Sequence, residues 1–295
     1  MASCSTCSTA GSCPGAAAGG GCDEMLRIQD ESIGETLSRI RHKLFVMSGK
    51  GGVGKSSVTV NAAAALAHEG ARVGILDVDM HGPSVPRLLG LTCGVEMDDR
   101  ERLVPAPAFE NLSVLSMDSL LQDKDQAVLW RGPKKNAAIR QFLSDVAWGD
   151  LDYLLIDSPP GTGDEHMTVL KTVPDAECIV VTTPQEVSLA DVRKAINFLQ
   201  YAGAKVLGIV ENMSGLVCPH CGGTIDLFLK GGGKALAARY GFPFLGAIPL
   251  DPATVVAADR GEPVVCLDGD HPAKIAFLAL ARNIARECGM EEAGN

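Results

Sequence analysis

Short apolar runs alternate with longer segments of helical periodicity along most of the chain, and turn residues separate them. The apolar runs predict strands over residues 44–47, 73–76, 112–115, 153–156, 179–182, 206–210 and 245–248. The periodic segments predict helices over residues 25–41, 57–69, 133–147, 165–172, 188–201, 233–240 and 273–287. Strand–helix alternation with short connections indicates an α/β fold with a doubly wound, mostly parallel sheet.

The composition supports this fold class and argues against several classes of protein. Hydrophobic residues make up 46% of the 295 residues and aromatic residues only 4%, as in sheets buried between layers of helices. No apolar run approaches the ~20 residues that span a bilayer, and no amino-terminal signal sequence is present. A net charge of −10 argues against general nucleic-acid affinity. We expect a cytoplasmic protein without membrane or nucleic-acid partners, whose last helix packs on the core.

The first 24 residues differ from the rest, since they are almost entirely Ser, Ala, Gly, Thr, Pro and Cys. Such a segment has too little apolar surface to fold alone, so we predict a flexible arm unless a metal orders it. Residues 25–295 contain no internal repeat and no long linker, and we predict one domain.

A phosphate-binding loop follows the first predicted strand. Its spacing, G-x-x-x-x-G-K-[ST], lets backbone N–H groups surround phosphate oxygens, while Lys55 reaches the β/γ-phosphates and the Ser56 hydroxyl binds Mg²⁺. The strand before it and the helix after it are the context that the motif requires, and they place the phosphates at a helix N-terminus. Lys50 is one lysine more than the loop needs. The predicted nucleotide-binding residues are Gly49, Lys50, Gly51, Gly52, Val53, Gly54, Lys55 and Ser56.

Other polar residues follow later strands at the same predicted edge of the sheet. An apolar strand ending in Asp157 is typical of a Walker B site, so Asp157 is expected to hold Mg²⁺ directly or through water. The Pro-Pro-Gly-Thr-Gly run after it is a candidate switch loop. Asp79 ends the Asp77-Val78-Asp79 run, and Asn212 is a candidate to hydrogen-bond the base. Taken singly, Asp77, Asp79 and Asn212 are equally well explained as capping or turn residues.

The loop from Lys50 to Ser56, the run 77–84 and the run 157–164 together resemble the Mrp family. These are iron–sulfur cluster carrier ATPases within the deviant-Walker, MinD/ParA-like group of P-loop NTPases, and the resemblance covers about residues 25–290. It implies an ATPase that converts ATP and water to ADP and phosphate at the interface of a homodimer. It also implies that Lys50 reaches the partner's nucleotide and that Asp79 positions the attacking water.

The Cys218-Pro219-His220-Cys221 turn presents two thiolates to one metal. A four-thiolate site needs two such turns, and a twofold dimer supplies the second. Spacing alone leaves zinc and an iron–sulfur cluster equally open, with His220 as a solvent-facing spacer. The family resemblance favours a [4Fe–4S] cluster that bridges the dimer.

The remaining cysteines form an arm set and a scattered set. The arm set matches a ferredoxin-like run seen in some family members, except that its last cysteine lies downstream of the run, which leaves that ligand and the cluster type open. We predict a second iron–sulfur cluster there, with a zinc-binding or redox-sensitive tail as the alternative. The scattered cysteines are interpreted as small buried hydrophobes. The arm set is Cys4, Cys7, Cys13 and Cys22, and the scattered set is Cys93, Cys178, Cys266 and Cys288.

The leading functional hypothesis is a carrier that assembles a labile cluster on Cys218 and Cys221 and passes it to apo iron–sulfur proteins, with ATP altering subunit geometry. One rival is a nucleotide-gated iron–sulfur reductase, but such proteins place a ligand cysteine in the second switch loop, and residues 157–164 contain none. Another rival is a MinD/ParA-type positioning ATPase, which the acidic charge and the cysteine sets disfavour.

Overall fold

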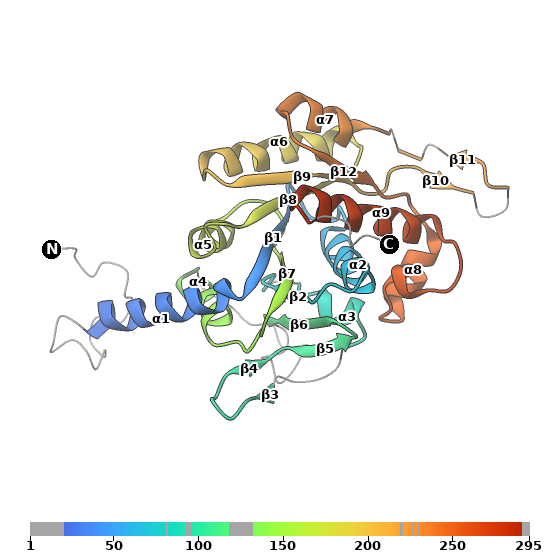
Figure 1. Cartoon of the computed structure of the whole chain (residues 1–295). Helices are drawn as coiled ribbons and strands as arrows, with labels where there is room; N and C mark the ends of the chain where they lie inside the picture. Colours follow the sequence, from blue (N-terminus) through green and yellow to red (C-terminus); the bar gives the residue numbers. More distant parts are fainter. Residues whose placement is uncertain are drawn as a thin grey trace.

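A single twisted sheet organises the molecule (Figure 1). The structure is a computed structural model that describes residues 21–80, 82–91, 96–117, 132–218, 221–225, 227–228 and 230–290, without the side chains of 21–23, 132–133 and 224. In these residues eight strands follow the order β12-β9-β8-β1-β7-β2-β6-β5, parallel throughout except where β5 meets β6. The strands are β1 (Ile40–Ser48), β2 (Val73–Asp77), β5 (Ala106–Phe109), β6 (Leu112–Ser116), β7 (Leu151–Asp157), β8 (Glu177–Thr182), β9 (Lys205–Glu211) and β12 (Phe244–Ala247). The predicted doubly wound, mostly parallel sheet is confirmed.

Helices cover both faces of this sheet, and two small hairpins extend from it. One face carries α2 (Lys55–His68), α3 (Val85–Leu88), α8 (Pro252–Asp259), α9 (Pro272–Glu287) and the short 3-10 helix η2 (Val264–Cys266). The other carries α1 (Gly21–Ser38), α4 (Gly132–Ser144), α5 (Asp164–Thr172), α6 (Glu186–Tyr201) and α7 (Gly232–Tyr240). The hairpins pair β3 (Glu96–Met97) with β4 (Leu103–Val104), and β10 (Leu216–Val217) with β11 (Thr224–Ile225).

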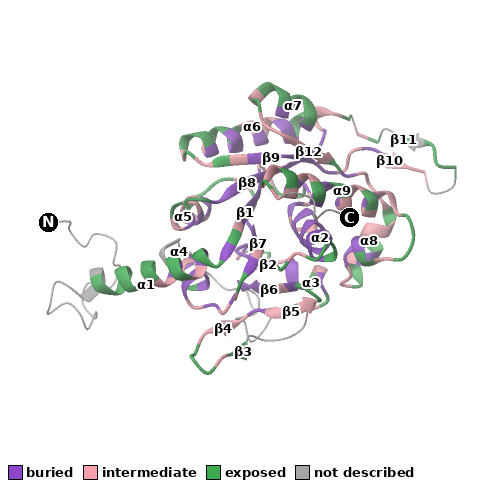
Figure 2. Ribbon diagram, viewed as in Figure 1, coloured by how far each residue is buried: buried purple, intermediate pink, exposed green. Residues whose placement is uncertain are grey.

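The central strand β1 contributes to two separate cores, because successive side chains of a strand point to opposite faces. Leu44 and Val46 pack into the core beneath α2 and α9, whereas Phe45 and Met47 pack into the core beneath α4, α5 and α6. All four side chains are buried, and Figure 2 shows the same burial through the middle of the sheet. The strand that leads to the predicted phosphate-binding loop is therefore fixed from both sides.

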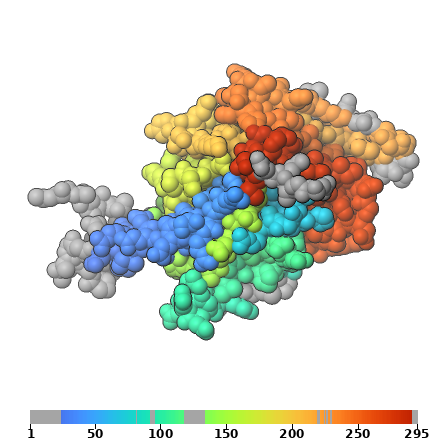
Figure 3. Space-filling model, in the orientation of Figure 1, coloured from blue at the N-terminus to red at the C-terminus, as the bar shows by residue number. Residues whose placement is uncertain are grey.

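Helix α1 lies across the predicted boundary between arm and domain. It begins at Gly21 and ends at Ser38, earlier at both ends than the predicted 25–41, because Ile40 already pairs with Leu151 in the sheet. Its second half packs on α4, where the Arg140 guanidinium contacts Asp30 at 2.6 Å. Its first half leaves apolar side chains such as Met25 exposed, and Figure 3 shows this end extending from the body in blue.

Two further helices were not predicted from the sequence. Helix α8 carries a clear start signal, since Asp251 accepts a hydrogen bond from the Ala253 N–H at 2.9 Å and Pro252 occupies the first turn. Helix α3 is a single turn and has no periodicity to detect. Within the described ranges, no helix combines the length and apolar character needed to cross a membrane.

Candidate nucleotide and cluster-binding sites

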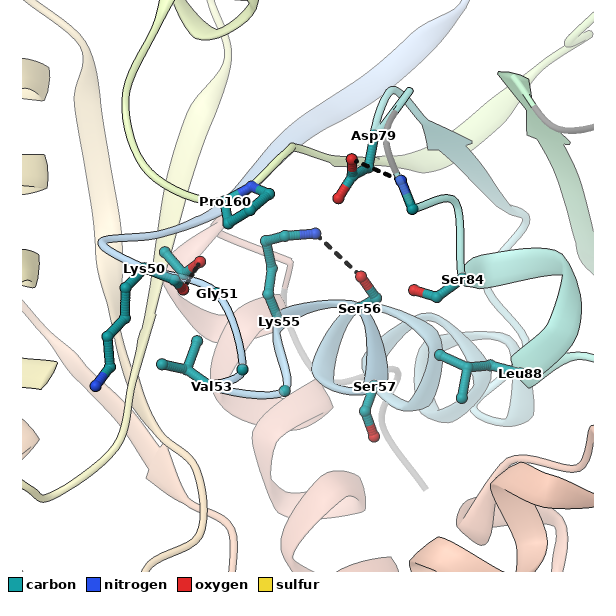
Figure 4. A pocket seen from close by; sticks show the side chains of 14 residues that line it. Lys50, Gly51, Val53, Lys55, Ser56, Ser57, Asp79, Ser84, Leu88 and Pro160 are labelled. Atoms are coloured by element: carbon teal, nitrogen blue, oxygen red, sulfur yellow. Dashed lines mark hydrogen bonds between the residues drawn. The ribbon is translucent and has the colours of Figure 1, made fainter. Parts of the chain in front are cut away.

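The loop between β1 and α2 surrounds a cavity of about 320 Å³ at the carboxyl edge of the sheet (Figure 4). Gly54 precedes α2 in the left-handed region, with φ of 78°, which turns the chain into the helix. Gly49 permits close contact with α6, because a Cβ there would lie 2.4 Å from the carbonyl carbon of Asp191. Helix α2 begins at Lys55, so its unpaired first N–H groups lie beside the cavity. Such a cradle suits the phosphates of a nucleotide.

Asp157, at the end of β7, gathers the donors of this loop. Its Oδ2 accepts from the Lys55 ammonium at 2.5 Å and from the Ser56 hydroxyl at 2.6 Å. Its Oδ1 accepts from the Thr59 hydroxyl at 2.5 Å. The carboxylate is fully buried, so these partners compensate its charge. An alcohol and a carboxylate that meet beside a phosphate cradle form the oxygen donor pair that Mg²⁺ prefers, and the residues fit the ion predicted for them.

Asp77 and Asp79 occupy different environments although only one residue separates them. Asp77 is fully buried and accepts from the Asp79 N–H at 3.0 Å and from the Ser116 hydroxyl at 3.3 Å. Burial, and then the nearby charge of Asp157, raise the pKa of Asp77 to about 8. Asp79 lines the cavity and accepts from the Gly82 N–H at 3.3 Å. Asp77 thus fixes the loop that brings Asp79 to the nucleotide site.

Glu211, the last residue of β9, and Asn212, which follows it, touch two different loops. The Asn212 amide donates to the Val53 carbonyl at 2.9 Å, and a Cβ on Gly54 would lie 2.3 Å from its Nδ2. Next to it, the buried Glu211 carboxylate accepts from the Ser214 hydroxyl at 2.6 Å and from the Gly231 N–H at 2.9 Å. Asn212 therefore contacts the phosphate-binding loop, while Glu211 joins both ends of the segment that contains the cysteine turn.

The cysteine turn connects β10 to β11 at the periphery of the molecule (Figure 1). The Cys218 N–H donates to the Gly223 carbonyl at 2.9 Å, and the Gly222 N–H donates to the Cys218 carbonyl at 2.9 Å. Gly222 has φ of 70°, which a residue with a side chain rarely adopts. Cys218 is half-buried and Cys221 is exposed. The turn thus holds two cysteines three positions apart in a tight, accessible knuckle.

The part of the chain that carries both sites matches one protein family. A family model described as ParA, NUBPL iron-transfer P-loop NTPase, matches residues 39–285. The chain belongs to this family. It is therefore a nucleotide-binding P-loop NTPase, and the predicted membership in a family of iron–sulfur carriers within the ParA-like group is confirmed.

Similar proteins agree with this assignment. The iron-sulfur cluster carrier protein of Methanocaldococcus jannaschii is 48% identical over 266 residues, which is 90% of either chain. The human cytosolic Fe-S cluster assembly factor NUBP2 is 48% identical, and the match covers 84% of this chain and 93% of that protein. A solved nucleotide-binding protein from Archaeoglobus fulgidus, in complex with ADP, is 42% identical with a TM-score of 0.71, covering 81% of this chain and 93% of that one.

In this iron-transfer NTPase, Lys50 is the loop residue that points away from its own site. Figure 4 shows its side chain extending away from Lys55. Its carbonyl accepts from the Ser48 hydroxyl at 2.9 Å, but its ammonium pairs with none of the described residues. The position is compatible with the predicted reach to a partner subunit, which stays a prediction, as does base recognition by Asn212.

Several predicted sites lie outside the described residues, and one interpretation is wrong. Pro219, His220 and the arm cysteines before residue 21 are not described; Cys22 lies in α1, but its side chain is not described, and Cys93 lies outside. Among the scattered cysteines Cys178 is buried as predicted, whereas Cys266 is exposed at the end of η2. Its neighbours Val264 and Val265 take the buried positions instead.

Sequence reasoning missed Thr59 and Glu211, which support the sites, and the buried His166. Thr59 and Glu211 hold Asp157 and the cysteine segment, but their roles depend on partners distant in sequence. His166, in the first turn of α5, is buried with its ring edge-on to Phe45 at 5.7 Å between centroids. Burial lowers the pKa of His166 to about 4, so the ring is neutral at physiological pH. Only Thr59 carried a signal, since it lies one helical turn after Lys55 on α2.

Proposed function

We propose that this chain is an ATP-hydrolysing carrier that binds a [4Fe–4S] cluster on Cys218 and Cys221 and transfers it to apo iron–sulfur proteins. The observation that carries the proposal is the accessible two-cysteine knuckle on the nucleotide-binding body of an iron-transfer NTPase. The names of the relatives, an iron-sulfur cluster carrier protein and a cytosolic assembly factor, support it and favour a cytoplasmic location.

The cysteine count supports a homodimer as the working form. A [4Fe–4S] cluster takes four thiolates, and the knuckle supplies two from each chain. Two chains related by a twofold axis would therefore complete one shared site. The exposure of Cys221 suits a cluster that must leave, because a transferable cluster has to be reached by the acceptor's thiols. The Lys50 ammonium, which pairs with none of the described residues, suits the same dimer, in which it would contact the partner's ATP.

The nucleotide site offers the groups that hydrolysis requires. Ser56 and Asp157 would hold Mg²⁺, which neutralises charge on the phosphates. Lys55, which contacts Asp157 in this structure, would turn to the β/γ-phosphates. Asp79 lines the same cavity and is the residue proposed to position the attacking water.

The proposal extends to the arm. Cys4, Cys7 and Cys13, with Cys22 as a possible fourth ligand, are proposed to hold a second iron–sulfur cluster. Helix α1 joins this arm to the body through its contacts with α4. An arm cluster would therefore be separate from the knuckle, and the two can be distinguished by substitution.

Anaerobic reconstitution with iron and sulfide tests the proposal. We expect Cys218→Ser/Cys221→Ser to lose the shared cluster, about two iron atoms per chain, relative to the wild type. Cys266→Ser is the matched control, since Cys266 is also exposed but lies outside the knuckle and the arm set. Zinc without sulfide in the wild type, or iron content unchanged by the double substitution, would contradict the carrier.

A transfer assay separates the carrier from the reductase. The reconstituted wild type should pass its cluster to an apo-ferredoxin-type acceptor, and the acceptor's absorption spectrum reports the transfer. A cluster that supplies electrons to an acceptor but is never lost from Cys218 and Cys221 would instead favour the nucleotide-gated reductase.

A further inference from the structure

A histidine, a glutamate and a cysteine meet at the amino edge of the sheet, opposite the nucleotide site. His42 lies near the start of β1, Glu177 opens β8, and Cys288 caps the end of α9. One ligand atom from each lies within 4.8 Å of the other two. Ser48 lies six positions after His42 along the extended strand β1, so this cluster is roughly 20 Å from the phosphate-binding loop.

The distances within the cluster are those of metal ligands. The His42 Nδ1 lies 3.6 Å from the Glu177 Oε2, and the Cys288 Sγ lies 3.7 Å from the same oxygen. A tetrahedral Zn²⁺ with bonds of about 2.0–2.3 Å separates its ligand atoms by about 3.3–3.7 Å. We propose that His42, Glu177 and Cys288 bind one divalent cation of the Zn²⁺ class, with water in the fourth position.

The surroundings orient these ligands. The Lys205 ammonium contacts Oε1 of Glu177, which leaves Oε2 to face the other two side chains. The Tyr153 ring stacks on His42 with centroids 5.3 Å apart and limits its rotation. Partners that fix a carboxylate and an imidazole in this way are typical of the groups around metal ligands.

One buried polar atom beside the cluster has no partner among the described residues, the Tyr153 hydroxyl. This hydroxyl belongs to the ring that stacks on His42 with centroids 5.3 Å apart. A metal-bound water at the open position would give this hydroxyl a hydrogen-bond partner. The Tyr153 hydroxyl without a partner among the described residues is therefore a second observation that indicates a bound ligand at this cluster.

Metal binding requires a neutral imidazole on His42 and a deprotonated thiolate on Cys288. Burial lowers the pKa of His42, so its ring is neutral and its Nδ1 can donate an electron pair. Burial raises the pKa of Cys288 to about 12, so the free protein holds a thiol. On binding, the sulfur forms the metal bond and its proton passes to solvent, as usual for thiolate sites.

Cobalt is a suitable probe, because a thiolate ligand to Co²⁺ gives a charge-transfer band and tetrahedral geometry gives strong visible absorption. The background is the full-length protein in which the other clustered cysteines are replaced by serine. This removes competing sites while it keeps Cys288. The replaced residues are Cys4, Cys7, Cys13, Cys22, Cys218 and Cys221.

In this background we expect about one Co²⁺ per chain with a single-thiolate spectrum, displaced by Zn²⁺. Cys288→Ser should remove the charge-transfer band, His42→Gln should weaken binding at least tenfold, and Cys266→Ser should change neither. Zn²⁺ should also raise the Tm of the background but not of its Cys288→Ser variant, a readout independent of ATP hydrolysis.

Two results would overturn the site. One is the absence of stoichiometric cobalt uptake by a background protein whose circular dichroism shows that it is folded. The other is a charge-transfer band that persists in Cys288→Ser, or a cobalt affinity that is unchanged in His42→Gln. Either would leave the cluster as an ion pair between Glu177 and Lys205 with two neutral neighbours.

Discussion

The edge of the sheet that carries the nucleotide site, called the nucleotide edge here, differs from the cysteine knuckle in burial and in the size of its supporting strands. At the nucleotide edge, Asp157 is fully buried in a parallel sheet and accepts hydrogen bonds from three side chains of α2. The knuckle lies on a hairpin whose strands are two residues long each, and Cys221 is exposed. The first arrangement holds charges in fixed positions, and the second leaves the thiol of Cys221 exposed.

The two regions meet at β9. Asn212 contacts the phosphate-binding loop, and its neighbour Glu211 binds the segment on either side of the knuckle. A movement of the loop on nucleotide binding therefore has a short covalent path to the cysteines. Two adjacent residues thus contact the stable site and the accessible one, and four substitutions test the differences between these regions.

Lys50→Ala should have the largest effect, and the effect should be confined to ATP hydrolysis at the nucleotide edge. If the ammonium stabilises transition-state charge in the partner's site, kcat for ATP hydrolysis should fall by about 10³-fold, as on loss of an arginine finger. The fold should be unaffected, because the ammonium pairs with none of the described residues. Steady-state ATPase assays and circular dichroism check this, with exposed Lys171→Ala as the control. Unchanged turnover would remove the argument for a lysine shared between subunits.

Gly54→Ala should break the contact between the loop and β9. Both φ of 78° and the approach to Asn212 oppose a side chain, so we expect a loss of about 3 kcal/mol in the free energy of unfolding. Gly52→Ala is the matched control, since φ is 80° but nothing lies within 4 Å of the added Cβ. It should cost about 1–2 kcal/mol.

Denaturant unfolding without nucleotide measures both variants, and a double variant identifies the cause. Adding Asn212→Ala to Gly54→Ala removes the obstructing amide, so part of the lost stability should return. Equal losses for Gly52→Ala and Gly54→Ala would show that Asn212 does not press on the loop.

Glu211→Gln should loosen the knuckle while the phosphate-binding loop stays intact. The amide replaces a buried charge that accepts from the Ser214 hydroxyl and the Gly231 N–H, at a cost of about 1–3 kcal/mol. We expect faster loss of the reconstituted cluster with ADP affinity unchanged. Ser214→Ala removes one of these bonds and should have a smaller effect. Cluster retention equal to that of the wild type would separate Glu211 from the cysteine site.

Asp77→Asn should be visible as a change in the pH dependence of stability. Asp77 has a raised pKa of about 8 in the folded protein, so the folded state binds its proton more tightly than the unfolded state does. Its contribution is present below the unfolded pKa and is lost as the pH rises towards 8.

Wild-type stability should therefore fall relative to Asp77→Asn between pH 5 and pH 8, by at most about 1.4 kcal/mol per pH unit. Urea unfolding of both proteins across this range measures the difference. Parallel stability profiles would show that Asp77 is ionised in the folded protein.

The sequence predicted most of the sheet because the strands are continuous apolar runs with turn residues at their ends. It also predicted the loop, Asp157 and the knuckle, since each is a local motif with its own spacing. It missed Glu211 and the cluster at His42, because both depend on side chains that only the fold brings together. It missed the early start of α1 because Gly21 and its polar neighbours resemble the low-complexity arm.

The division of β1 between two cores has a consequence for sequence variation. Leu44 and Val46 serve one core and Phe45 and Met47 the other, so every one of these positions is constrained by shape. The edge strand β5 is half-buried and antiparallel, and its side chains do not contribute to two buried cores. We expect tolerance to substitution to rise from β1 outwards, so the strand that carries the phosphate-binding loop is where a library of random variants should retain the fewest folded members.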